Sequence, residues 1–172
     1  LTKNGSLKSV LDGIDAATKV GLTPVKVNTV LMKGINDDEL VDFCNYAGES
    51  GVTVRFIELM NTGPSQEFVR KHFLSAKEAK RYLGKQFDMV PRFDEQGGAP
   101  AQEFLLPDLK DTTIGFIASE TEPFCSQCNR LRVTAGGRIL GCLYEPNGVQ
   151  LMPLLRNKQS DLTEFNNLLR EV

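Results

Sequence analysis

Three of the four cysteines lie close together in the sequence and could bind a metal. Cys125 and Cys128 have the C-x2-C spacing that lets two thiolates ligate one centre, and Cys142 follows after thirteen intervening residues. Structural zinc needs a closed shell of four ligands. A 4Fe-4S cluster normally takes four cysteines, so three leave one iron with an open position. The spacing therefore indicates a metal site that keeps room for a ligand.

Other interpretations of these cysteines stay open. A zinc site could take Cys44, His72 or a carboxylate as its fourth ligand. Cysteine also packs as a small hydrophobic residue, although the polar, glycine-rich sequence here is poor core material. A disulfide framework is not expected, because the chain is long enough to bury a core without one.

Two arginines follow the second cysteine directly. Arg130 and Arg132 would point the same way if the segment is extended, because side chains alternate along a strand. Solvated arginines on a strand are the simpler interpretation. Guanidinium groups beside an open metal position favour instead the binding of an anionic molecule.

The elements that must position these groups begin with a strand, a helix and a strand. Residues 24–32 and 52–60 are apolar and β-branched, which predicts buried strands. A helix between them is expected to be capped by the sequence from Asn36 to Glu39 and to end at Gly51. This order predicts a βαβ unit with parallel strands.

Three polar residues interrupt the two strands. Lys26 and Asn28 share one face of the first strand, and Arg55 lies in the second. Charges inside such a sheet are unfavourable unless they are paired or meet a ligand. In one interpretation these residues pair with a neighbouring carboxylate or lie at a solvent-exposed strand edge. In the other they line the mouth of a barrel and hold an anion, and the sequence leaves both interpretations open.

The rest of the chain has shorter elements. A capping box at Ser75 and Glu78 predicts a short helix to Leu83, and residues 91–103 are rich in proline and glycine and predict a loop. A hairpin turn at residues 134–138 would bring Cys142 back toward the other two cysteines. Short strands are predicted at 102–106, 114–118, 131–134 and 138–143.

Composition is that of an ordinary globular chain. It has 172 residues, 41% hydrophobic and 24% charged residues, and a net charge of −2, so nothing global indicates nucleic acid or an anionic membrane as partner. No apolar run has the length of a membrane span, and no targeting signal is visible. We expect a cytoplasmic protein, or a mitochondrial matrix protein in a eukaryote.

Three segments together resemble one family. They are Val25–Asp37, Arg55–Met60 and Cys125–Thr134, the last with its Cys-Asn-Arg-Leu-Arg block. They resemble the molybdenum cofactor biosynthesis protein A family, the radical S-adenosylmethionine enzymes also called GTP 3′,8-cyclases. The likeness runs through essentially the whole chain in the same order.

The resemblance implies an α/β fold and a set of ligands. Residues 1–63 would form the second half of a partial (β/α) barrel, and residues 64–172 an α+β domain with antiparallel strands. A second 4Fe-4S cluster, whose free iron contacts the guanine of GTP, would be held by Cys125, Cys128 and Cys142. The residues implied to bind GTP are Lys26, Arg55, Arg130, Leu131 and Arg132. Those implied to contact S-adenosylmethionine are Asn28, Ile57 and Met60.

The resemblance also implies a reaction and its partners. In this family a 5′-deoxyadenosyl radical removes hydrogen from the ribose, and attack of that carbon on guanine C8 begins the cyclic pyranopterin precursor. The partners implied are GTP as substrate, the next enzyme of the pathway, and a possible second copy of the chain.

One motif of the family is missing from the sequence. The first 4Fe-4S cluster, on Cys-x3-Cys-x2-Cys, has no counterpart here, and Cys44 is expected to be a buried helix residue. We therefore expect a C-terminal portion that cannot generate the radical alone, and no residue is assigned a catalytic role. The alternatives are a zinc-stabilised binding module without catalysis and another radical enzyme with an auxiliary cluster.

Overall fold

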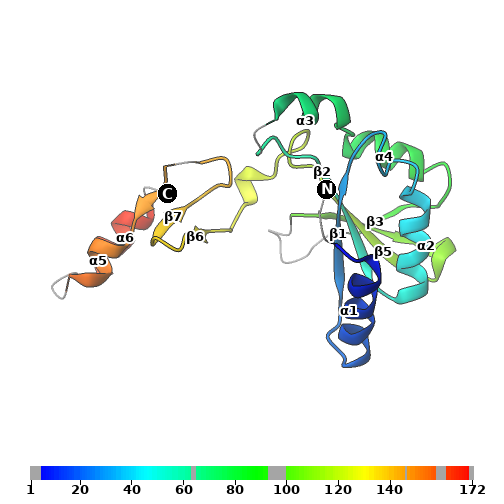
Figure 1. Cartoon of the computed structure of the whole chain (residues 1–172), viewed down its shortest axis with the longest axis horizontal. Helices are drawn as coiled ribbons and strands as arrows, with labels where there is room; N and C mark the ends of the chain where they lie inside the picture. Colours follow the sequence, from blue (N-terminus) through cyan, green and yellow to red (C-terminus); the bar gives the residue numbers. More distant parts are fainter. Residues whose placement is uncertain (1–4, 63–64, 93–99, 146, 158–161, 171–172) are drawn as a thin grey trace. The chain divides into compact units, whose positions relative to one another are not determined.

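The computed structural model describes residues 5–62, 65–92, 100–145, 147–157 and 162–170. The chain forms two compact units, Leu1–Ser126 and Gln127–Val172 (Figure 1). No helix in the described ranges is long and apolar enough to cross a membrane.

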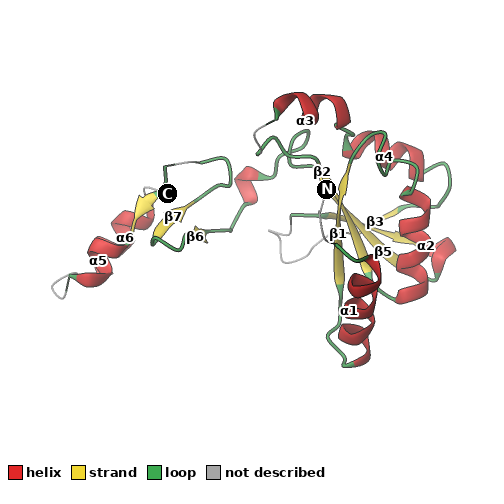
Figure 2. Cartoon of the chain, in the orientation of Figure 1, coloured by secondary structure: helices red, strands yellow, loops and turns green. Residues whose placement is uncertain are grey.

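The first unit is a five-stranded sheet with helices (Figure 2). Its helices are α1 (Leu7–Lys19), α2 (Leu40–Ser50), α3 (Gln66–His72), α4 (Ala76–Leu83) and the short 3₁₀ helix η1 (Pro107–Leu109). Its strands are β1 (Lys26–Leu31), β2 (Thr53–Glu58), β3 (Val90–Arg92), β4 (Gln102–Leu106) and β5 (Thr112–Ile117). The strand order is β1-β2-β5-β4-β3. β1, β2 and β5 pair in parallel, whereas β4 pairs antiparallel with both β5 and β3.

The predicted βαβ unit is confirmed, but its helix cap is wrong. β1 and β2 pair in parallel with α2 between them, and Gly51 ends α2 in the left-handed conformation with φ of 66°. Asn36 does not cap α2, whose N-cap is Glu39 without a side-chain bond. Instead Asn36 accepts from the Met32 amide at 2.8 Å and donates to the Val30 carbonyl at 2.9 Å, so it closes the turn after β1.

One face of the sheet forms the core of this unit. Apolar side chains from the central strands, including Val54, Phe56 and Phe116, pack against α2 and α4, which cover this face (Figure 1). The Phe56 and Phe116 rings are 5.4 Å apart between centroids. The predicted capping box is confirmed, because Ser75 and Glu78 bond each other's backbone amides at the start of α4.

The loop predicted over residues 91–103 is partly wrong. Its two ends belong to β3 and β4, which pair antiparallel, while residues 93–99 lie outside the described residues. Pro91 lacks an amide hydrogen, and it is tolerated because β3 is the edge strand of the sheet. β5 pairs directly with β2, so the sheet continues across residue 63, where the sequence analysis puts a domain boundary.

The second unit contains a small antiparallel sheet of β6 (Arg132–Val133), β7 (Arg138–Leu140) and β8 (Val149–Gln150). The predicted hairpin turn is confirmed by two bonds of 2.9 Å, from Thr134 N–H to the Arg138 carbonyl and from Gly137 N–H to the Thr134 carbonyl. Two helices follow, α5 (Met152–Arg156) and α6 (Leu162–Arg170). Ile139 is the one buried hydrophobic side chain in the described part of this unit. The chain is thus a mixed α/β sheet followed by a separate antiparallel sheet.

Candidate functional site

Polar side chains gather on the face of the first sheet opposite α2 and α4. Asn28 pairs with Arg55, Arg55 with Gly115, and Gly115 with Glu103, so these four residues form one row across the strands. Lys26 lies two residues before Asn28 and therefore on the same face. We call Lys26, Asn28, Arg55 and Glu103 the polar face.

Glu103 joins the two cations of the polar face. Its Oε1 atom lies 3.5 Å from Lys26 Nζ and 3.3 Å from Arg55 Nη2. The Arg55 side chain is only 15% exposed, and its Nε atom is buried without a hydrogen-bond partner among the described residues. Pairing with a carboxylate was one of the interpretations that the sequence left open, and the structure shows it. Pairing does not exclude anion binding, because an ammonium has three N–H donors and a guanidinium five.

Gly115 makes room for this ion pair. β5 lies between Arg55 in β2 and Glu103 in β4, so the arginine side chain must cross β5 at Gly115. A Cβ atom at Gly115 would lie 3.3 Å from Arg55 Cγ and 3.3 Å from Ala101 Cβ. The missing side chain explains how Arg55 reaches a carboxylate two strands away.

The three residues expected near S-adenosylmethionine lie around the same strands. Asn28 is exposed on the polar face, and Ile57 is half-buried two residues after Arg55 on that face. Met60 is half-buried in the segment just beyond the C-terminal end of β2. The structure thus brings Asn28 and Ile57 onto the face with Lys26 and Arg55.

Glu58 was missed by the sequence analysis. Its side chain is fully buried at the end of β2. Oε1 accepts from the Ala76 amide at 2.8 Å and the Thr121 hydroxyl at 2.5 Å, and Oε2 accepts from the Glu120 and Thr121 amides at 2.9 Å. Burial raises the pKa of Glu58, but the bonds from the Thr121 hydroxyl and the three amides outweigh it and hold the pKa below its ordinary value. An ionised carboxylate therefore fastens α4 and the segment after β5 to the end of β2. The sequence signal that could have indicated this buried carboxylate is a glutamate within an otherwise largely apolar strand.

Cys44 and His72, the two alternative zinc ligands, both lie in the first unit. Cys44 is fully buried in α2, as predicted, and burial raises the pKa of its thiol to about 12. His72 Nδ1 lies 2.8 Å from the Lys33 carbonyl, and its ring centroid lies 4.6 Å from that of Phe68, with the two rings tilted by 42°. The buried Cys44 thiol is therefore not available as the fourth ligand of a zinc site, whereas the Lys33 contact involves only one of the two ring nitrogens of His72.

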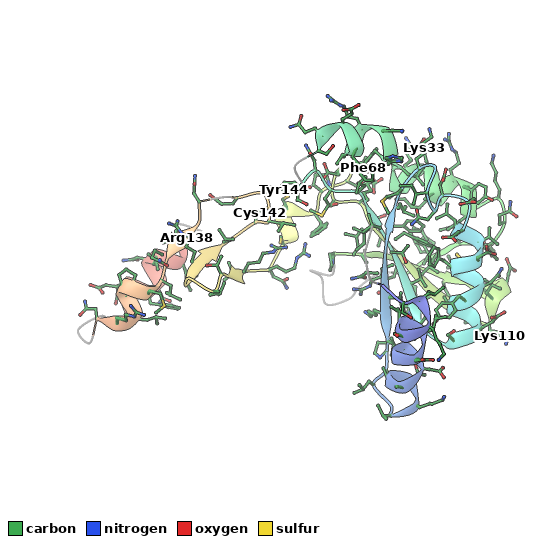
Figure 3. The ribbon with its side chains drawn as sticks, viewed as in Figure 1. Lys33, Phe68, Lys110, Arg138, Cys142 and Tyr144 are labelled. Carbon is green, nitrogen blue, oxygen red and sulfur yellow. The ribbon has the colours of Figure 1, made fainter. Side chains whose placement is uncertain are left out.

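The other three cysteines are exposed free thiols, and two have donors at sulfur. The backbone amide and the guanidinium of Arg130 donate to Cys128, and with the charges of Arg130 and Arg132 they lower the pKa of the Cys128 thiol. The Tyr144 amide donates to Cys142 Sγ at 3.4 Å, and Figure 3 shows the two residues together in the segment after β7. Since the thiolate is the metal-binding form, these donors suit metal ligands.

The division between the two units passes through the expected ligand set. The 3₁₀ helix η2 (Cys125–Gln127) begins with Cys125 in the first unit, while Cys128 and Cys142 belong to the second. Within the described ranges, no three His, Cys, Asp or Glu side chains are placed to hold a metal ion. The residues expected to bind GTP in the second unit are the exposed Arg130 and Leu131 before β6 and the half-buried Arg132 within it.

Comparisons with known proteins agree with the resemblance seen in the sequence. Residues 52–172 match the family described as Molybdenum Cofactor Synthesis C. The chain is 42% identical to the GTP 3′,8-cyclase of Paenarthrobacter nicotinovorans over 94% of this chain and 48% of that protein. It is 40% identical to the GTP 3′,8-cyclase of Marinobacter nauticus over 91% of this chain and 47% of that protein. The chain spans about half the length of the curated relatives it matches. With this match over most of its length, the chain belongs to the Molybdenum Cofactor Synthesis C family.

Proposed function

We propose that this chain is the GTP-binding part of a GTP 3′,8-cyclase of molybdenum cofactor biosynthesis. The observation that carries the proposal is the convergence of Lys26 and Arg55 on one oxygen atom of the polar face. Relatives that align with nearly the whole chain are named GTP 3′,8-cyclases. We also propose that the parallel strands β1, β2 and β5 belong to a partial (β/α) barrel of the radical S-adenosylmethionine type.

The cations of the chain suit a triphosphate. Lys26 supplies a compact charge and Arg55 a planar set of donors, and both are rooted in strands of a packed sheet. Phosphate oxygens take charge-assisted hydrogen bonds from such groups, and these bonds strengthen where water is partly excluded. Arg130 and Arg132 would add two further cations, with Leu131 against the nucleotide.

The three exposed thiols are the proposed ligands of a 4Fe-4S cluster. Cys125, Cys128 and Cys142 would hold it, and the Arg130 donors at Cys128 stabilise the thiolate form of that residue. When bound, a cluster with three protein ligands offers one iron for coordination of the purine. Asn28, Ile57 and Met60 would contact S-adenosylmethionine at the polar face and the end of β2.

GTP binding to the anaerobically reconstituted chain tests the proposal. Calorimetric titration should show Arg55→Met and Lys26→Met binding GTP about tenfold or more weakly, the effect of losing one charge-assisted bond. Lys8→Met is the matched control, because Lys8 is exposed on α1 and paired only with Asp12 among the described residues.

Two results would overturn the proposal. One is equal GTP affinity in the wild type, both variants and the control. The other is tightly bound zinc without iron or sulfide after reconstitution, which would favour a structural binding module. An electron paramagnetic resonance signal of the reduced cluster that changes on addition of GTP would support the proposed contact between nucleotide and iron.

A further inference from the structure

Glu103 occupies the place where a bound anion would lie. One of its oxygen atoms is within 3.5 Å of Lys26 Nζ and Arg55 Nη2, so a single negative oxygen bridges two cations from neighbouring strands. A phosphate oxygen carries similar charge and accepts the same bonds. A polyphosphate that binds Lys26 and Arg55 must therefore share or displace this carboxylate.

The carboxylate is free enough to move. The Glu103 side chain is 24% exposed, in contrast to Glu58, which is fully buried and bonded on both oxygens. The described contacts of Glu103 are the two ion pairs, and both involve the same oxygen atom. Among the described residues, rotation of the side chain would thus break only those two ion pairs.

A third cation, Arg92, lies on the other side of Glu103. Arg92 in β3 is the direct cross-strand partner of Glu103 in β4, so the two side chains share a face and lie within reach of each other. Arg92 now donates through Nη1 to the Thr113 hydroxyl at 2.8 Å and is exposed. Arg92 can therefore pair with the Glu103 carboxylate when that carboxylate leaves Lys26 and Arg55.

We propose that Glu103 is an internal counter-ion that holds Lys26 and Arg55 in the absence of ligand and moves to Arg92 when a polyphosphate binds. The inference rests on the proposed function and adds a residue that sets the affinity of the same site. The bound ligand class is a nucleoside triphosphate or an inorganic polyphosphate, since the triphosphate part alone meets these cations. Without the counter-ion, the nearly buried Arg55 would lack a described charge partner before binding.

The test compares anion affinity in variants of the chain. Glu103→Gln should bind inorganic tripolyphosphate and GTP about tenfold more tightly than the wild type, because no carboxylate competes for the cations. Glu103→Asp keeps the charge on a shorter side chain and should lie between the two. A gain in affinity is informative because a purely structural defect would weaken binding.

Double variants test the two positions of the carboxylate. The gain from Glu103→Gln should vanish when Arg55→Met is added. Arg92→Met should weaken binding about threefold in the wild type and have no effect in Glu103→Gln, because Arg92 influences binding only through the Glu103 carboxylate. Circular dichroism melting shows which variants are folded. If Glu103→Gln does not fold, the affinity of Glu103→Asp provides the test.

The outcomes separate this inference from the proposed function. Unchanged or weaker tripolyphosphate binding by folded Glu103→Gln and Glu103→Asp overturns the counter-ion, even if GTP binding depends on Lys26 and Arg55. Tighter tripolyphosphate binding without any affinity for GTP retains the counter-ion and overturns the GTP site.

Discussion

The two compact units fix their polar groups in different ways. In the first, Arg55 extends from a strand whose other face is covered by α2 and α4, and Phe56 beside it is fully buried. In the second, Cys128 lies before β6 and Cys142 just after β7, and Ile139 is the one buried hydrophobic side chain among its described residues.

This difference has an energetic consequence. Units with a small core usually depend on a metal, a disulfide or a partner for stability. The first unit can therefore place its cations by packing alone, whereas the second would gain much of its order from metal binding. A substitution in the core of the first unit and a substitution of a cysteine in the second should therefore affect different measured properties.

The largest effect is expected from the core of the first unit. Phe56→Ala should lower the free energy of unfolding by about 4 kcal/mol, because it leaves a cavity between β2 and the helices. Urea unfolding followed by circular dichroism measures the loss. Phe68→Ala, at a side chain that is 41% exposed, is the matched control and should change stability by less than about 1 kcal/mol. Equal losses of stability in the two variants would contradict the expected difference between a core and a surface side chain.

The next effect separates the exposed from the buried cysteines. Cys128→Ala should reduce the iron content after anaerobic reconstitution by about tenfold or more, because a proposed cluster ligand is lost. Cys44→Ala should keep its iron and lose about 1 kcal/mol of stability from the small cavity in the core. Iron and sulfide assays measure the first change and urea unfolding the second. Equal iron content in the two variants would contradict the assignment.

Glu58 gives a pH-dependent effect confined to the first unit. Its pKa is lowered in the folded chain, so its contribution to stability is present above the unfolded pKa and is lost as pH falls through the lower folded pKa. Glu58→Gln should therefore cost about 2 kcal/mol at pH 7, and the difference from the wild type should shrink in acid. Urea unfolding across pH measures it. Glu49→Gln, at an exposed residue of α2, should follow the wild type at every pH.

The smallest effect tests the crossing point of the ion pair. Gly115→Ala should cost about 1 kcal/mol and weaken tripolyphosphate binding about threefold, because the added Cβ crowds Arg55. Gly13→Ala is the matched control, since a Cβ there meets nothing within 4 Å and alanine favours the α1 helix. Unchanged tripolyphosphate affinity in Gly115→Ala would show that the position of Arg55 does not depend on this gap.

Local patterns in the sequence were enough to predict the βαβ unit, the capping box at Ser75 and the hairpin after β6. Their signals are periodicity and short capping or turn motifs, which act within a few residues. Asn36 was misread because its bonds go backward to the turn after β1 rather than forward to α2.

The partners of Lys26 and Arg55 could not be predicted in the same way. Glu103 reaches them only because β5 inserts between β2 and β4, with Gly115 at the crossing. That strand order is set by the packing of the whole sheet. Glu58 was missed for a similar reason, since two of its donors, Glu120 and Thr121, are 62 and 63 residues away in sequence.

The Glu58 carboxylate also affects how the chain exchanges its amide hydrogens. The Glu120 and Thr121 amides lie in a turn, where exchange with solvent is normally fast, yet both donate to a fully buried carboxylate. Opening that turn would leave a negative charge in the core with fewer donors, so the turn and the first amide of α4 should open together. These amides should exchange as one slow group, and their common rate would report how often the segment leading to Cys125 leaves the sheet.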